Sequence, residues 1–120
     1  MNWRVEFYQK ANGDIPVKDF LESLPEKHRA KAYWEIELLA EYGQALKEPY
    51  VKHIEKSAPK SIWELRIKFG GDASRIFYFM SAGSTFIMLH GFLKKTQKTP
   101  KNEIETALRY MNDFLARYKP

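Results

Sequence analysis

Three short apolar segments rich in β-branched and aromatic residues follow one another within residues 61–101, and they constrain the fold more than any other feature. They span Ile62–Phe69, Ser74–Met80 and Thr85–Phe92. The loop GGDA separates the first pair and SAGS separates the second pair, and short Gly-containing loops between such segments are typical of hairpins. We therefore predict two consecutive hairpins that form an antiparallel meander.

The same stretch also holds the net positive charge of the protein. Residues 61–101 carry seven Lys or Arg residues against two acidic residues, whereas basic and acidic residues balance in the rest of the chain. The formal net charge of +5 therefore lies on the predicted meander. A basic surface favours a polyanionic or acidic partner, so we expect the meander to form the functional surface.

A strand and two helices are predicted before the meander. Residues 3–8 alternate between apolar and polar side chains, as a half-buried strand does. Asp14 is expected to cap a short helix. Ser23–Glu26 form a capping-box pattern for a second helix, which should end near Tyr42 with Gly43 as its stop. The expected apolar positions, which would cover one sheet face, are Val17, Phe20, Leu21 and Leu24 in the first helix and Ala30, Tyr33, Trp34, Leu38 and Tyr42 in the second.

The rest of the chain completes one α+β domain, residues 1–120, with the order β-α-α-β-β-β-α. Residues 44–60 form a polar connection that is long for an unstructured loop, so part of it is expected to be ordered or mobile. Thr99 and Pro100 are expected to begin a last helix, as its N-cap and first-turn proline. The apolar stripe of this helix comprises Ile104, Ala107, Leu108, Met111, Leu115 and Tyr118.

Composition argues against several other protein classes. The sequence has no long apolar run and no charged leader followed by an apolar stretch, so we expect neither a transmembrane span nor a signal peptide. It contains no cysteine, which excludes disulfides and thiolate metal sites and fits a reducing cytoplasm. His28, His53 and His90 lack metal-ligand spacing and the carboxylates do not cluster, so no metal or other cofactor is expected.

Strand alternation places several basic side chains on one face of the predicted meander. If both hairpin loops contain four residues, Lys68 lies opposite Arg75, and Arg75 lies opposite His90. Three cationic or potentially cationic groups in a row repel one another unless an anion lies between them, and an RNA phosphate is the expected anion. A loop of odd length or a β-bulge would break this row.

The same face is expected to present Phe77 and Phe79, whose rings would stack on RNA bases. The basic rim would continue past the last strand with Lys94, Lys95 and Lys98. Ordinary structural roles compete with each assignment. Arg66 and Lys68 would be solvated on a half-exposed sheet, and residues 94–98 would be a solvated loop before a helix. The two phenylalanines would be core residues of a central strand, and His90 would be a structural histidine.

Four motifs carry a resemblance to a known protein family. They are Trp63–Ile67 (WELRI), Phe69–Asp72 (FGGD), Arg75–Tyr78 (RIFY) and, most specifically, His90–Pro100 (HGFLKKTQKTP). These motifs resemble the phage-derived HigB-type toxins of the RelE/ParE superfamily, over nearly the whole chain and with the same element order. The resemblance implies a RelE-like fold: a small, mostly antiparallel sheet with a concave basic face, an N-terminal helical hairpin and a C-terminal helix.

The resemblance also implies a function. Members are toxins of type II toxin–antitoxin systems, and RelE-like members enter the ribosome and cut mRNA without a metal ion. The ribose 2′-hydroxyl attacks the adjacent phosphate and leaves a 2′,3′-cyclic end. The expected partners are mRNA on the ribosome and a HigA-type antitoxin with a helix-turn-helix domain. The toxin would contact DNA only indirectly, through this antitoxin. The protein would act in the cytoplasm without contacting a membrane.

Three candidate phosphate-binding residues follow from matching positions. Arg66 and Lys68 match the basic pair on the first meander strand of the superfamily, and Arg75 matches the arginine on the next strand. Their role would be to bind the scissile phosphate and stabilise the transition state.

The proton-transfer residues have more than one candidate. His90, or a lysine whose pKa is lowered by its basic neighbours, would accept the 2′-hydroxyl proton. Lys94 or Lys95 would protonate the leaving 5′-oxygen. Tyr110 and Tyr118 lie within the last predicted helix, so neither matches the C-terminal tyrosine that some RelE toxins use.

Two other functions stay open. ParE-like members share the fold but poison DNA gyrase. A non-enzymatic module that binds RNA or the ribosome would use the same basic face. The predicted row of Lys68, Arg75 and His90 favours RNA cleavage over gyrase inhibition.

Overall fold

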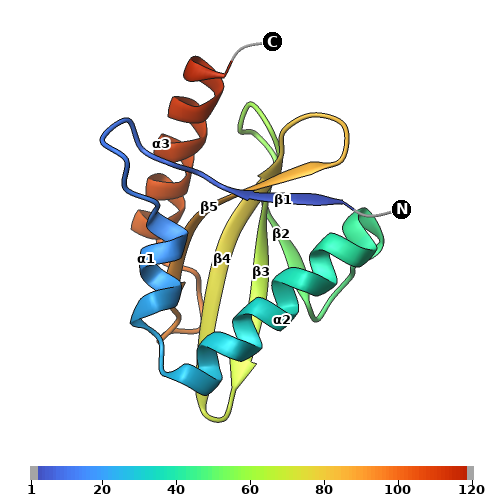
Figure 1. The fold of residues 1–120 in the computed structure, drawn as a ribbon, viewed down its shortest axis with the longest axis vertical. Coiled ribbons are helices and arrows are strands. Elements are labelled where there is room, and N and C mark those ends of the chain that lie inside the picture. Colours follow the sequence, from blue (N-terminus) through green and yellow to red (C-terminus); the bar gives the residue numbers. More distant parts are fainter. Residues whose placement is uncertain (1–2, 119–120) are drawn as a thin grey trace.

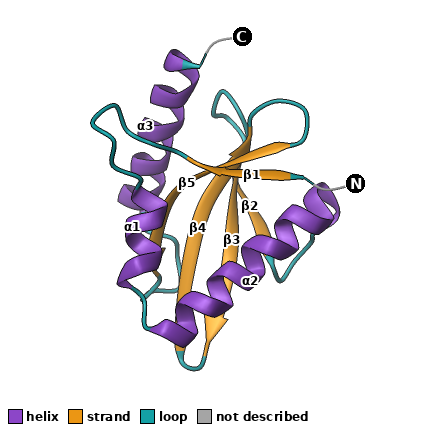
Figure 2. Ribbon diagram, viewed as in Figure 1, coloured by secondary structure: helices purple, strands orange, loops and turns teal. Residues whose placement is uncertain are grey.

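The computed structural model describes residues 3–118 of the chain (Figure 1). The described residues form three α-helices, one 3-10 turn and five strands (Figure 2). In chain order they are β1 (Arg4–Phe7), α1 (Pro16–Ser23), α2 (Glu26–Tyr42), η1 (Gly43–Ala45), β2 (Val51–Glu55), β3 (Ile62–Phe69), β4 (Asp72–Met80), β5 (Thr85–Leu93) and α3 (Lys101–Arg117). None of the helices within these residues is both long and apolar enough to span a lipid bilayer.

The strands form one mixed sheet in the order β1-β5-β4-β3-β2. β1 runs parallel to β5, and the other neighbours are antiparallel. The predicted α+β class and the antiparallel meander of β3, β4 and β5 are therefore confirmed. The predicted element order was incomplete because β2 forms within the connection of residues 44–60, where Val51 is buried and pairs with Leu65.

Helices cover both faces of the sheet. α1 and α2 pack on one face, where their buried side chains meet the inward residues of β3, β4 and β5. This cluster contains Val17, Leu21, Leu24, Ala32, Ile36, Leu39, Val51, Leu65, Ile67, Ile76, Tyr78, Phe86 and Met88. α3 packs on the opposite face, where Ala107 and Met111 meet Phe77, Phe79 and Leu89. β4 is buried on both faces and is a central strand of the sheet. A strand covered by helices on both sides needs apolar residues on both faces.

The buried face of α2 differs from the predicted one. Tyr33, Trp34 and Tyr42 are exposed, and the residues that face the sheet are His28, Ala32, Glu35, Ile36 and Leu39. Two of these inward residues are polar, and each has a partner. The His28 ring lies 3.0 Å from the hydroxyl of Ser74 on β4, and Lys31 donates to Glu35 at 2.9 Å. The apolar periodicity of α2 favours the aromatic face, because the true inner face carries these two polar residues.

The helix ends also depart in part from the predicted capping chemistry. Gly43 ends α2 with a φ of 55°, as expected, and a Cβ atom at this position would lie 1.9 Å from the Trp3 ring. No side chain caps the N-terminus of any of the three α-helices, so the predicted caps at Asp14, Ser23 and Thr99 are wrong. The Thr99 hydroxyl instead donates to the Glu64 carboxylate, at 3.1 Å.

Candidate anion-binding site on the basic sheet face

The register of the first hairpin places two arginines side by side. The loop contains only Gly70 and Gly71, with Phe69 opposite Asp72 and a φ of 60° at Gly70. Two-residue hairpin loops favour glycine at positions that adopt a positive φ, as Gly70 does here. Arg66 is therefore the direct cross-strand partner of Arg75.

The predicted row of three cationic side chains is not formed. Lys68 pairs with Ala73, because the loop is two residues shorter than expected. In the second hairpin Met80 pairs with Phe86 and not with Thr85, which shifts the register by one residue. A β-bulge between Phe77 and Tyr78 adds a second one-residue shift, so that His90 pairs with Phe77. Arg75 pairs with Phe92 instead of His90. A shift of two residues preserves the side-chain face, so His90 stays on the face of Arg75. The single shift near the second loop moves Phe86 and Met88 to the opposite face.

A buried carboxylate lies between the two arginines. Glu64 is 1% exposed, and its Oε1 atom lies 3.3 Å from Nε of Arg75 and 3.6 Å from Nε of Arg66. Its Oε2 atom accepts a hydrogen bond from Thr99 at 3.1 Å. Since like charges directly opposite on neighbouring strands are destabilising, Glu64 is the group that allows the arginine pair to form.

The Arg75 side chain is deeply buried for an arginine, with 4% exposure. Its Nη1 atom donates to the Ser74 carbonyl at 3.0 Å. Burial lowers the pKa of Arg75, and the charge of Glu64 partly offsets this. Among the described side chains, the buried Nε atoms of Arg66 and Arg75 lack a hydrogen bond of good geometry. The Arg66 side chain is 27% exposed and the Arg75 side chain 5%, so an anion would reach the arginine pair from the side of Arg66.

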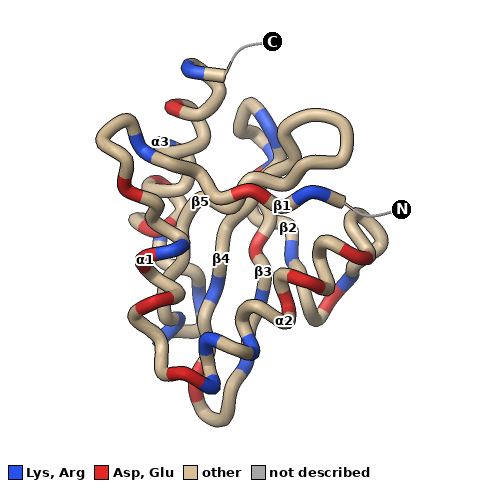
Figure 3. The backbone as a smooth tube through the Cα atoms, viewed as in Figure 1, with Lys and Arg blue, Asp and Glu red and all other residues tan. Residues whose placement is uncertain are grey.

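Two lysines complete what we call the basic cluster: Lys52, Arg66, Arg75 and Lys94, gathered around Glu64. Lys52 is the cross-strand partner of Glu64 on β2. The Lys94 backbone N–H donates to the Ala73 carbonyl at 2.8 Å, which ties the segment after β5 to β4. Burial lowers the pKa of Lys94, and the charges of Arg75, Arg66 and Lys52 lower it further. Basic residues along β3 and β4 are visible in Figure 3.

His90 has a different partner from the one expected. Its Nε2 atom lies 2.7 Å from Oε1 of Glu103, in the first turn of α3. Because an ionised carboxylate only accepts hydrogen bonds, Nε2 carries the proton and Nδ1 is left as the second ring position. His90 and Arg75 are on neighbouring strands and their side chains share a face, but they are diagonal neighbours.

The other candidate residues divide into two groups. Lys68, Lys95 and Lys98 are exposed, outside the buried part of the cluster. Phe77 and Phe79 are fully buried beneath α3, so neither ring presents a face to a base, and their predicted role in stacking is wrong for this structure. Their position on a central strand covered by a helix is the physical reason.

Sequence reasoning missed Glu64, Lys52 and Glu103 as parts of the site. The acidic residue within the basic meander was a usable signal for Glu64, since a lone carboxylate among cations usually pairs with them. Lys52 was not recoverable without knowing that residues 51–55 form an edge strand. Within residues 3–118, no group of three or more His, Asp or Glu residues is arranged to hold a metal ion.

The basic cluster can bind a polyanion and stabilise added negative charge. Several cationic groups converge on one carboxylate, so the local charge is positive even after that carboxylate is counted. Fixed guanidinium groups need little reorganisation when charge develops on a phosphate, which is what stabilises a pentacoordinate transition state.

The sequence matches the model of a known family, described as Phage derived protein Gp49-like (DUF891), over residues 19–112. The matched segment begins within α1, ends within α3 and contains all residues of the basic cluster. No curated protein matches the chain.

Proposed function

Because the chain belongs to the Gp49-like family of phage-derived proteins, a RelE/HigB-like toxin family, we propose that it is a HigB-type toxin that cuts mRNA on the ribosome. Membership of a toxin–antitoxin family also suggests an antitoxin as its partner. We take that partner to be a HigA-type antitoxin with a helix-turn-helix domain. Cleavage would be independent of metal ions.

The observation that carries this proposal is the arginine pair on β3 and β4. Arg66 and Arg75 lie opposite each other, next to Lys94 and on the same side of the sheet as His90. Two adjacent guanidinium groups match the geometry of a phosphodiester, because each can donate two N–H groups to its oxygens. They would bind the scissile phosphate and neutralise the charge that develops on it.

The cleavage step follows from this arrangement. The 2′-oxygen of the ribose attacks the adjacent phosphorus, and the bond from phosphorus to the 5′-oxygen breaks. His90 accepts the 2′-hydroxyl proton at Nδ1, while Glu103 holds Nε2–H and so fixes the tautomer. Lys94 donates a proton to the leaving 5′-oxygen, and its lowered pKa makes it a better acid than an ordinary lysine. The products are a 2′,3′-cyclic phosphate and a free 5′-hydroxyl.

Primer extension on a translated mRNA tests this proposal. The purified chain is treated with EDTA, the chelator is removed, and the protein is added to a reconstituted translation system with its ribosomal magnesium intact. We expect new 5′ ends within the translated region. Arg4→Gln serves as a control, because Arg4 is an exposed cation on the opposite edge strand.

Two results would contradict the proposal in different ways. Blocked translation with intact mRNA would indicate a non-enzymatic ribosome binder. Unaffected translation combined with inhibition of DNA supercoiling by gyrase would indicate a ParE-like toxin.

A further inference from the structure

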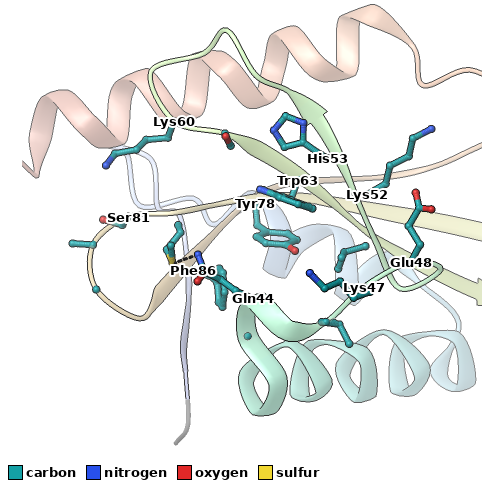
Figure 4. Close-up of a pocket in the computed structure, with 17 residues that line it drawn as sticks. Gln44, Lys47, Glu48, Lys52, His53, Lys60, Trp63, Tyr78, Ser81 and Phe86 are labelled. Atoms are coloured by element: carbon teal, nitrogen blue, oxygen red, sulfur yellow. Dashed lines mark hydrogen bonds between the residues drawn. The ribbon is translucent and has the colours of Figure 1, made fainter.

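A second positively charged site lies on the other face of the sheet, at the end that α2 leaves uncovered. α2 ends at Tyr42, and the chain turns away through η1. The corner of the sheet formed by β2, β3 and the β4–β5 hairpin therefore lacks a helix above it. A cavity of about 960 Å³ occupies this corner (Figure 4).

The floor of the cavity is apolar and aromatic. Trp63 and Tyr78 are direct cross-strand partners, and their rings lie next to each other on the cavity wall (Figure 4). Val51 and Phe86 complete the floor. Trp63 is 36% exposed although β3 is an interior strand of the sheet. The His53 ring on β2 lies nearly perpendicular to the Trp63 ring, at a centroid distance of 4.9 Å. Because Tyr78 and Phe86 are almost fully buried, Trp63 supplies most of the aromatic surface that a ligand would meet in this concave site. Aromatic and apolar lining is the usual composition of a small-molecule site.

The rim of the cavity is cationic. Lys47, Lys52 and Lys60 line it against a single carboxylate, that of Glu48. Figure 4 shows Lys47 reaching toward Tyr78, whereas Lys60 and Lys52 lie at opposite ends of the site. An apolar aromatic floor with lysines at its rim is complementary to a flat ring that carries a phosphate.

We propose that this cavity binds one nucleotide unit, with the base on Trp63 and the phosphate at the lysine rim. Stacking on an exposed aromatic ring stabilises a bound base and tolerates any base. The lysines supply the ionic contacts, and the Tyr78 hydroxyl and the Gln44 amide supply polar groups at the wall. The site goes beyond the proposed cleavage function and does not depend on it.

Lys52 connects the cavity to the basic cluster. It lines the cavity, and its charge also contributes to the lowered pKa of Lys94 on the other side of the sheet edge. A single RNA strand that passes over β2 would therefore place one phosphate near Lys52 and the next base in the cavity. Free nucleotides and an RNA strand share the same chemistry, and the experiment must separate them.

The test is a titration of the full-length protein followed through the indole N–H signals of its tryptophans in ¹H–¹⁵N NMR spectra. The chain has three tryptophans, so Trp63→Phe identifies the signal of Trp63. The ligands are a nucleoside monophosphate, the corresponding nucleoside, inorganic phosphate, a short single-stranded RNA and a pentaglutamate peptide. We expect the monophosphate and the RNA to shift the Trp63 signal, and the nucleoside and phosphate alone to bind more weakly.

Charge variants decide whether the rim is involved. Lys47→Gln combined with Lys60→Gln should weaken binding of the monophosphate on the order of tenfold, as the loss of phosphate contacts implies. Lys18→Gln removes one exposed cation on α1, outside the cavity, and should change nothing. Tighter binding of RNA than of the monophosphate would identify a strand as the natural ligand, whereas equal affinity would identify a free nucleotide.

Two outcomes would overturn the inference. The first is a Trp63 signal that no nucleotide moves at millimolar concentration. The second is an affinity for pentaglutamate as high as the affinity for RNA of equal charge. That result would identify the cavity as a binding surface for an acidic peptide. Arg75→Lys, a variant outside the cavity, should retain nucleotide binding even if it loses cleavage, so the two proposals can fail separately.

Discussion

The Oε1 atom of Glu64 lies 3.3 Å from the Nε atom of Arg75, and both side chains are almost fully buried. Taking two charges out of water is costly, and their attraction offsets that cost only when the geometry is favourable. Here the same carboxylate also faces Arg66 and accepts a hydrogen bond from Thr99. Glu64 therefore holds the guanidinium groups in place and joins the sheet to the segment that leads into α3.

Replacing Glu64 with glutamine tests this role. Glu64→Gln keeps the shape but removes the charge, so it leaves two adjacent arginines without a counter-ion. We expect the free energy of unfolding to fall by about 3–5 kcal/mol, as for other broken buried ion pairs. The pKa of Lys94 should fall further, because the charge of Glu64 raises it in the native protein. Denaturant unfolding and NMR titration of the Lys94 side chain measure the two effects, and an unchanged value for both would contradict this account.

The lowered pKa of Lys94 predicts a specific pH dependence. An acid works only in its protonated form, so the cleavage rate should fall as pH rises through the pKa of Lys94. Since burial and neighbouring cations lower this pKa, the fall should begin below the ordinary lysine value of 10.5. Lys94→Gln should be slower and should lack this alkaline decline, whereas Lys95→Gln, which removes an exposed cation, should retain it. If the cleavage rate of Lys94→Gln fell at alkaline pH in the same way as that of the native protein, Lys94 would be excluded as the acid.

The buried carboxyl group of Glu35 should make the protein less stable as pH rises, whereas a typical ion-paired carboxylate makes a protein more stable. Burial raises its pKa, and Lys31 offsets this only in part. The folded protein therefore holds the proton more tightly than the unfolded chain, so ionisation of Glu35 costs stability as pH rises above 4.5. Glu35→Gln should raise the melting temperature at pH 7, and the gain should disappear below pH 4. A variant that is less stable at neutral pH would show that the pair with Lys31 outweighs the burial cost.

Gly91 in the HGF motif has a packing role. A Cβ atom there would lie 2.4 Å from Cδ2 of Phe20 on α1, closer than any real contact. Gly91→Ala should therefore destabilise the protein by about 1–3 kcal/mol, as overpacking does. Gly71→Ala is the matched control, because nothing lies within 4 Å of its added Cβ atom. Equal stability of the two variants in denaturant unfolding would contradict the packing argument.

The sequence predicted those features of the fold that depend on residues close together in the chain. Apolar runs bounded by Gly-containing loops placed β3, β4 and β5 correctly, and the same face of β3 and β4 carries Arg66 and Arg75 as expected. Hairpin register depends on loop geometry, and a two-residue loop at Gly70 replaced the expected four-residue loop. The bulge after Phe77 had no signal in the sequence, because both faces of β4 are apolar there.

The candidate site was predictable only in part for a related reason. Its basic residues are concentrated in one stretch of sequence, so charge counting found them. Their pairing with Glu64, and that of His90 with Glu103, depends on contacts between distant elements. Lys52 joins the site only because β2 adds to the edge of the sheet, which a short polar segment does not indicate.

The most direct test of the central claim is single-turnover cleavage of mRNA on programmed ribosomes, with the chemical state of the new 3′ ends determined by mass spectrometry. Arg75→Lys is the variant to compare with the native protein, because lysine keeps the charge next to Glu64 but loses the planar donor pair. Arg4→Lys is the control. We predict 2′,3′-cyclic phosphate ends from the native protein and the control, and a rate lower by about 10²–10³ in Arg75→Lys. Uncut mRNA with the native protein, or full activity in Arg75→Lys, would contradict the account.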